Sequence, residues 1–280
     1  MLFKVAVYAL VFGGLICLLL VSCQSSLIYH PRAYDAGFRQ SYGAVAEPIP
    51  YAVDGQGEQV AYLFPKQAEG SPPPRRIWFC FGGNAALGME WLYTLHGSTR
   101  WEDTAFVMID YPGYGDCAGS PSPDSIRQSY RAAAAKVRER FNLEEADLAE
   151  RSRVLGHSLG AAAALLCAND LGVKHAVLIS PFTSMGDMAR RAVGSPLCYL
   201  LRHRFDNRAA LDAFVAAGGK AEIFHGTRDQ VIPASMGDEL AKAHPGAAVF
   251  HPVEGAGHND ILGGQFAEAD VLAAIGRFSQ

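Results

Sequence analysis

The residues best suited to chemistry stand in the segment Gly156-His157-Ser158-Leu159-Gly160. An apolar run, Arg153–Leu155, precedes it and the alanine-rich stretch Ser158–Leu171 follows, which predicts a strand that turns sharply into a helix. A serine on such a turn presents its hydroxyl clear of the backbone, and small residues on either side let the turn close. We therefore predict that Ser158 is a nucleophile. The alternative is a serine that only caps a glycine-rich helix start.

A serine hydroxyl needs a general base, and the base needs an acid that orients it. Asp229 follows the predicted strand Ala221–Phe224, where an acid would come after the serine along the chain. Its alternative role is an ordinary turn or helix cap. Among the later histidines, His258 lies in a glycine-flanked loop before the last predicted helix and is our candidate base. His244, at a helix end, and His251, at a strand end, are interpreted as structural.

Acyl transfer from a serine also requires backbone amides that stabilise a developing oxyanion. One amide should belong to Leu159, the residue after the nucleophile. The second should come from the loop Phe81-Gly82-Gly83-Asn84-Ala85, where glycines let the main chain approach a substrate. We favour the amide of Asn84 over that of Ala85, and a plain glycine turn is the alternative.

Short apolar runs alternate with helix-forming stretches through most of the chain. This alternation predicts an α/β fold, with a mostly parallel central sheet, helices on both faces and ligands bound beyond the carboxyl ends of the strands. Ser26–Tyr29 and Gln59–Phe64 are expected to extend one edge as antiparallel strands. The other predicted strands are Ile77–Phe81, Ala105–Ile109, Arg153–Leu155, Ala176–Ile179 and Ala221–Phe224, and the predicted helices are Asp124–Phe141, Ser158–Leu171, Ala234–Ala243 and Asp260–Phe278.

Composition excludes several classes of protein. Half of the 280 residues are hydrophobic and 19% are charged, which excludes disordered, collagen-like and coiled-coil chains. The net charge of −4, without a basic run, argues against a nucleic-acid partner. No Cys/His spacing is typical of zinc, and we expect neither a metal nor a cofactor. Cys80 and Cys167 should be free and buried, whereas Cys117 and Cys198 could pair in an exported protein.

The first residues have the pattern of an export signal or an uncleaved membrane anchor, with Lys4 followed by the apolar run Val5 to Val21. Leu20-Val21-Ser22-Cys23 resembles the lipobox of bacterial lipoproteins, which implies removal of residues 1–22 and acylation of Cys23. In such lipoproteins an Asp after the cysteine often marks inner-membrane retention. Gln24 stands there instead, which implies a periplasmic-side lipoprotein, at the outer membrane if the source is Gram-negative.

Several motifs together resemble the α/β-hydrolase superfamily, and more narrowly the small membrane-tethered serine hydrolases that include the animal protein depalmitoylases. These motifs are Gly82-Gly83-Asn84-Ala85, Asp110-Tyr111-Pro112-Gly113-Tyr114-Gly115, Gly119-Ser120-Pro121-Ser122, Gly156–Gly160, Ser180-Pro181-Phe182-Thr183-Ser184 and His225-Gly226-Thr227-Arg228-Asp229. The resemblance implies Ser158 as nucleophile, Asp229 as acid and His258 as base. The family usually has His-Gly-Asn where this chain has Gly82-Gly83-Asn84, so that loop must be held differently here.

The chain is expected to hold one hydrolase domain, residues 46–280, after a lipidated tether and edge strand, residues 23–45. The segment of about 182–211 takes the place of a cap. Its apolar residues (Phe182, Leu197, Tyr199, Leu200 and Leu201) could line an acyl pocket, or the segment could be a helix packed on the sheet with solvated arginines.

These observations predict a serine hydrolase that cleaves carboxylic ester or thioester bonds of a small-molecule, lipid or acylated substrate at a membrane. One alternative is a serine aminopeptidase, which should hold the substrate amine with acidic residues, whereas the cap is mainly basic. Another is a non-catalytic binding lipoprotein, in which we would expect a residue of the triad to be lost.

Overall fold

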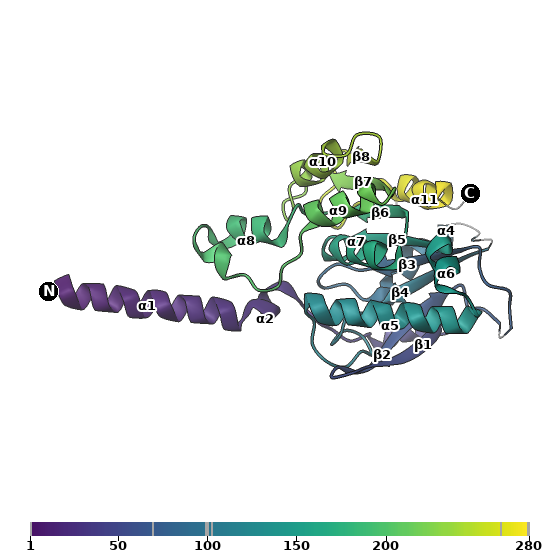
Figure 1. The fold of residues 1–280 in the computed structure, drawn as a ribbon, viewed down its shortest axis with the longest axis horizontal. Helices are drawn as coiled ribbons and strands as arrows, with labels where there is room; N and C mark the ends of the chain where they lie inside the picture. The colour runs from purple at the N-terminus through teal and green to yellow at the C-terminus, as the bar shows by residue number, and fades with distance from the viewer. Residues whose placement is uncertain (1, 69, 99–100, 102, 264, 279–280) are drawn as a thin grey trace.

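An eight-stranded sheet forms the centre of the computed structural model, which describes residues 2–278 except 69, 99, 100, 102 and 264 (Figure 1). Its spatial order is β1-β2-β4-β3-β5-β6-β7-β8. Strand β2 is antiparallel to both neighbours, and the adjacent pairs from β4 to β8 are parallel. The strands are β1 (Glu47–Val53), β2 (Gly57–Phe64), β3 (Arg76–Phe81), β4 (Thr104–Ile109), β5 (Ser152–His157), β6 (His175–Ile179), β7 (Lys220–Gly226) and β8 (Ala248–Val253).

Helices cover both faces of this sheet. Every residue of β4 is buried, and successive side chains of a strand point to opposite faces, so neither face is open to solvent there. Helix α7 packs against β3, β5 and β6, and α11 packs against β6. The helices are α1 (Leu2–Ser22), α2 (Gln24–Ile28), α3 (Ala36–Tyr42), η1 (Gly88–Trp91), α4 (Leu92–Ser98), α5 (Pro123–Phe141), α6 (Glu145–Arg151), α7 (Leu159–Leu171), α8 (Met185–Val193), η2 (Leu197–Leu200), α9 (Asn207–Ala216), α10 (Ala234–Lys242) and α11 (Glu268–Arg277).

The predicted fold class is confirmed, and each predicted parallel strand is present. The edge strand β1 was not predicted, because Pro48 and Pro50 interrupt its sequence. Proline cannot donate a ladder hydrogen bond, but an edge strand has one side without a partner and tolerates it. In β1 alternate residues, Ile49, Tyr51 and Val53, are buried against the domain.

One predicted element is wrong, and another is shorter than predicted. Ser26–Tyr29 is not a strand, because the helical hydrogen bonds of α1 run on through Cys23 into α2 (Cys23 N–H to the Leu19 carbonyl, 2.9 Å). The last helix begins at Glu268 rather than Asp260. The Asp260 carbonyl instead accepts from the Gly263 amide in a tight turn, at 2.7 Å.

The possible disulfide between Cys117 and Cys198 does not form, since both thiols are free. Cys117 is buried beside β2, where its sulfur accepts from the Val60 amide at 3.3 Å. Cys198 is buried in η2, within the cap.

Helix α1 projects away from the sheet, and Figure 1 shows it extending well beyond the rest of the chain. Residues Phe3–Ser22 are long and apolar enough to cross a membrane, a property that signal sequences share. The cap, which comprises α8, η2 and the connections around them, lies beside the junction of α1 and α2, where η2 contacts α1 (Figure 1).

Candidate active site

Ser158 occupies a sharp turn between β5 and α7, as the sequence predicts. Its backbone dihedrals, φ 56° and ψ −117°, are strained for a residue with a side chain, and its amide donates to the Ile179 carbonyl at 2.8 Å. The flanking glycines are required by close approach of backbone. A Cβ on Gly156 would lie 2.2 Å from the Gly160 carbonyl oxygen, and one on Gly160 would lie 2.1 Å from the Phe81 oxygen. The fold therefore forces this serine onto the end of the sheet.

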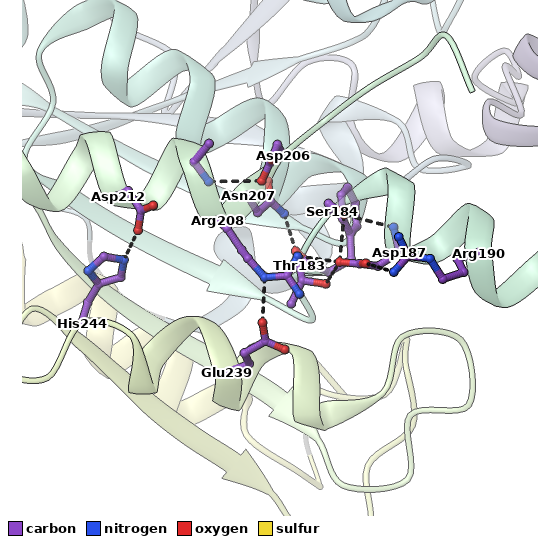
Figure 2. Close-up of polar contacts among 12 residues, drawn as sticks. Thr183, Ser184, Asp187, Arg190, Asp206, Asn207, Arg208, Asp212, Glu239 and His244 are labelled. Carbon is purple, nitrogen blue, oxygen red and sulfur yellow. Dashed lines mark hydrogen bonds and ion pairs between the residues drawn. The ribbon is translucent and has the colours of Figure 1, made fainter. Parts of the chain in front are cut away.

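The structure brings Ser158, His258 and Asp229 together in one hydrogen-bonded chain. His258 Nε2 lies 3.0 Å from Ser158 Oγ, and His258 Nδ1 lies 2.6 Å from Asp229 Oδ2. Because a carboxylate can only accept, Nδ1 carries the proton and Nε2 is free to accept from the serine hydroxyl. His244 instead pairs with Asp212 at 2.9 Å (Figure 2).

The Asp229 carboxylate is held at both oxygens. Oδ1 accepts from the Val231 and Ile232 amides at 2.9 and 2.8 Å, while Oδ2 faces His258. Burial alone would raise the pKa of Asp229, but the hydrogen bonds from His225, His258 and Ile232 hold this pKa well below its usual range. The acid therefore stays ionised at neutral pH and can stabilise an imidazolium on His258.

Two further histidines, to which the sequence pattern assigns no role, contact this hydrogen-bonded chain. His225 Nε2 lies 3.3 Å from Asp229 Oδ2 and 2.9 Å from the Ile232 carbonyl. His157 Nε2 lies 3.0 Å from the His258 carbonyl oxygen, to which it donates. Burial and the nearby His258 lower the pKa of His157 to about 4, so His157 is neutral at physiological pH. Both stand inside motifs that carry predicted triad residues, 156–160 and 225–229, and this position was the available signal.

The candidate oxyanion loop lies directly over Ser158. A Cβ on Gly83 would lie 3.3 Å from His157 Nδ1 and 3.7 Å from the Ser158 Cβ, so this loop packs directly against the serine turn. Within the described part of the chain, neither the Asn84 amide nor the Leu159 amide has a hydrogen-bond partner. Leu159 begins α7, where the first amides have no partner inside the helix and point towards a ligand.

Groups other than a histidine hold this loop. Tyr111 donates to the Gly82 carbonyl and Tyr114 to the Asn84 carbonyl, each at 2.6 Å. The Asn84 side chain donates to the Ile28 carbonyl at 3.0 Å, which joins the loop to α2. Two buried tyrosines and one amide therefore hold the main chain where the family's usual histidine is missing.

A cavity of about 630 Å³ extends from Ser158 towards the cap and the N-terminal helices. Ser158, His258 and Gly83 line its inner end. Most of its lining is apolar, and the apolar residues come from α8 (Met185, Met188), from η2 and the residue after it (Leu197, Leu200, Leu201), and from α1 and α2 (Leu20, Leu27, Ile28). Phe182 also lines the cavity, whereas Tyr199 is 66% exposed. The cap thus provides apolar lining on its inner side and carries solvated arginines on its outer side.

A sequence profile described as "Alpha/beta hydrolase family" matches residues 70–221. The chain belongs to this family. An uncharacterized protein of Mycobacterium tuberculosis is 28% identical over 276 residues, which cover 98% of this chain and 93% of that protein. Alpha/beta hydrolase domain-containing protein 17B of Xenopus tropicalis is 31% identical over 215 residues, 76% of this chain and 70% of that protein.

Solved structures share the fold of this α/β-hydrolase at much lower identity. An esterase of Pyrococcus furiosus superposes with a TM-score of 0.66 at 11% identity, covering 90% of this chain and 98% of that one. The esterase domain of a Rhodothermus marinus protein gives 0.56 at 16% identity, covering 84% and 97%. The matches confirm the architecture in which the site is built.

In this α/β-hydrolase a polar network joins the two ends of the cap, and we call this junction the neck of the cap (Figure 2). A backbone bridge joins Ser184 to Asp206, one on each side of the cap. Asp187 accepts from Ser184 Oγ at 2.9 Å and from Arg208 Nη1 at 2.6 Å, and Arg208 Nε also reaches Glu239 on α10 at 2.7 Å. The two ends of the cap are therefore fixed to the hydrolase domain and to each other.

Proposed function

We propose that this protein is a serine hydrolase that cleaves carboxylic ester or thioester bonds through an acyl-enzyme. The observation that carries the proposal is the unbroken chain from Ser158 Oγ through His258 to Asp229, with contacts of 3.0 and 2.6 Å, at the inner end of an apolar cavity. The cavity volume falls within the ~300–1,000 Å³ range of ligand pockets.

The reaction would begin when Ser158 Oγ attacks the acyl carbon and His258 Nε2 takes its proton. The amides of Leu159 and Asn84 would donate to the oxygen that gains negative charge, and Asp229 would stabilise the imidazolium. His258 then protonates the departing alkoxide or thiolate. In the second half, His258 takes a proton from water, the hydroxide attacks the acyl-enzyme, and the acid is released as Ser158 regains its proton.

The cavity lining favours an ester or thioester over a peptide with a free amino terminus. An aminopeptidase needs a carboxylate to hold the substrate ammonium. Glu90, the acidic residue among the described cavity-lining residues, already forms an ion pair with Arg32 and accepts from the Leu87 amide at 2.8 Å. The intact chain of hydrogen bonds from Ser158 through His258 to Asp229 argues against a purely binding protein, in which a member of the triad is expected to be lost.

We propose further that the N-terminal segment attaches the enzyme to a membrane, on the periplasmic side. Cys23 is exposed at the junction of α1 and α2, where an acyl transferase could reach it. Labelling of cells with an alkyne fatty acid tests this proposal. If the protein is a lipoprotein, the parent carries the label and Cys23→Ser does not, and the mass of the parent shows that residues 1–22 have been removed. A full-length mass without label would show an uncleaved anchor instead.

The catalytic proposal is tested with the full chain in mild detergent and a series of p-nitrophenyl esters from acetate to palmitate. We expect turnover that Ser158→Ala abolishes and that Ser120→Ala, at an exposed serine, leaves unchanged. A fluorophosphonate probe should label the parent and Ser120→Ala but not Ser158→Ala. Equal inertness of the parent and Ser158→Ala, without labelling, would refute the proposal.

A further inference from the structure

The cap has a charge opposite to that of the whole chain. Residues 185–205 contain four arginines (Arg190, Arg191, Arg202 and Arg204) and one carboxylate, Asp187, a net +3, whereas the whole chain carries −4. All four arginines are exposed, and Asp187 is engaged at the neck of the cap. Arg191 and Arg202 have no carboxylate partner within the described ranges. The exposed surface of the cap is therefore net positive, and we call it the cationic face.

This cationic face is fixed to the first residues after α1. The buried side chain of Gln24 donates from Nε2 to the Leu200 carbonyl at 2.7 Å, and its Oε1 accepts from the Arg202 amide at 2.6 Å. Helix η2 also contacts α1 directly. In Figure 1 the cap accordingly lies on the side of the molecule from which α1 projects.

The position of α1 sets the depth of the cap relative to a bilayer. Twenty helical residues from Phe3 to Ser22 span ~30 Å, the thickness of the hydrocarbon core, so a membrane-crossing α1 would end at the interface. A lipid on Cys23 would place the membrane at the same point. Tyr199 and Leu27, 66% and 61% exposed, lie in this zone together with the arginines, a composition typical of membrane interfaces.

We propose that the cap docks on the surface of an anionic bilayer, with Arg191 and Arg202 against lipid headgroups and Tyr199 inserted between them. One consequence, which rests on the proposed function, concerns substrate entry. Leu27 is exposed and also lines the cavity, so the cavity meets the surface at α2. In the docked state this opening faces the bilayer, and the acyl chain of a membrane-resident substrate reaches Ser158 without crossing water.

The test is a full-length Tyr199→Trp variant in brominated-lipid vesicles, either neutral (phosphatidylcholine) or anionic (with phosphatidylglycerol). The measured quantity is the quenching of tryptophan fluorescence in the variant beyond that in the parent, because the parent's own tryptophans contribute a background. We expect excess quenching in anionic vesicles that weakens at high salt. Adding Arg191→Glu and Arg202→Glu should lower the docked-to-undocked ratio by about 25-fold or more, at about fivefold for each arginine lost.

Lys66→Glu with Arg75→Glu is the matched control, because it makes the same change in net charge at exposed residues outside the cap. Undiminished quenching in this control supports the proposal. Absence of excess quenching in anionic vesicles, or equal loss in the control, would overturn it.

Turnover of p-nitrophenyl acetate in the same vesicles separates docking from catalysis. It should be unchanged in the Arg191→Glu, Arg202→Glu variant, because neither arginine lines the cavity. If no variant cleaves the acetate, the proposed hydrolase function fails, and the quenching still decides whether the cap docks.

Discussion

Two groups whose pKa values are shifted by burial should titrate with opposite effects on stability. Burial and the nearby His258 lower the pKa of His157 from 6.5 to about 4. Burial raises the pKa of Asp110 from 3.8 to about 7, although its carboxylate accepts from the Gly88 amide at 2.6 Å and the Tyr34 hydroxyl at 2.7 Å. The folded state therefore resists a proton on His157 and retains one on Asp110.

The sign of each contribution follows from these shifts. The stability contributed by His157 is complete above pH 6.5 and is lost as the pH falls towards 4, which amounts to about 2 kcal/mol between pH 7 and pH 5. The contribution of Asp110 is complete below pH 3.8 and is lost as the pH rises through 7, so acidification over the same interval restores about 2 kcal/mol. In the parent protein the two effects offset each other.

Amide substitutions at His157 and Asp110 separate the two contributions to stability. Urea unfolding of the full chain in detergent at pH 7 and pH 5 gives the free energy of unfolding at each pH. On acidification His157→Gln, which keeps a donor for the His258 carbonyl, should gain about 2 kcal/mol relative to the parent, and Asp110→Asn should lose about 2 kcal/mol. His244→Gln, which removes the contact with the exposed Asp212, is the control for loss of a histidine away from the site. A parent-like pH dependence in either test variant would refute the assignment for that residue.

Three other outcomes are expected. In thermal unfolding, Gly160→Ala should destabilise the fold by about 3 kcal/mol, because its Cβ would meet a fixed carbonyl of β3. Gly276→Ala is the control: its Cβ has nothing within 4 Å, and it should stabilise the helix by up to about 1 kcal/mol. Similar values for the two variants would contradict the packing argument. Asp229→Asn should fold normally and lower kcat for p-nitrophenyl esters by about 10⁴-fold, and a tenfold effect or less would remove Asp229 from its orienting role. Without reductant, Cys117 should react with iodoacetamide only after denaturation, and a disulfide-linked peptide pair of Cys117 with Cys198 would contradict the structure.

Local sequence was sufficient to predict an element where neighbouring residues along the chain decide its conformation. The apolar runs of β3 and β4 and the glycines around Ser158 act over a few residues, so their spacing already indicates a strand that turns into a helix. Local sequence failed where distant segments decide. The apolar residues of 26–29 suit either a strand or a helix, and the upstream helix continues through them. Strand β1 depends on its pairing with β2 and on its packing against α5.

By itself the sequence determined the fold class and named Ser158, Asp229 and His258, because their order and motifs are properties of the chain. The tertiary structure decided which groups hold that site in place. His157 meets the His258 carbonyl 101 positions away, and Gln24 meets Leu200 176 positions away. Hydrogen bonds between such distant residues depend on how the elements pack, and no spacing along the chain encodes them.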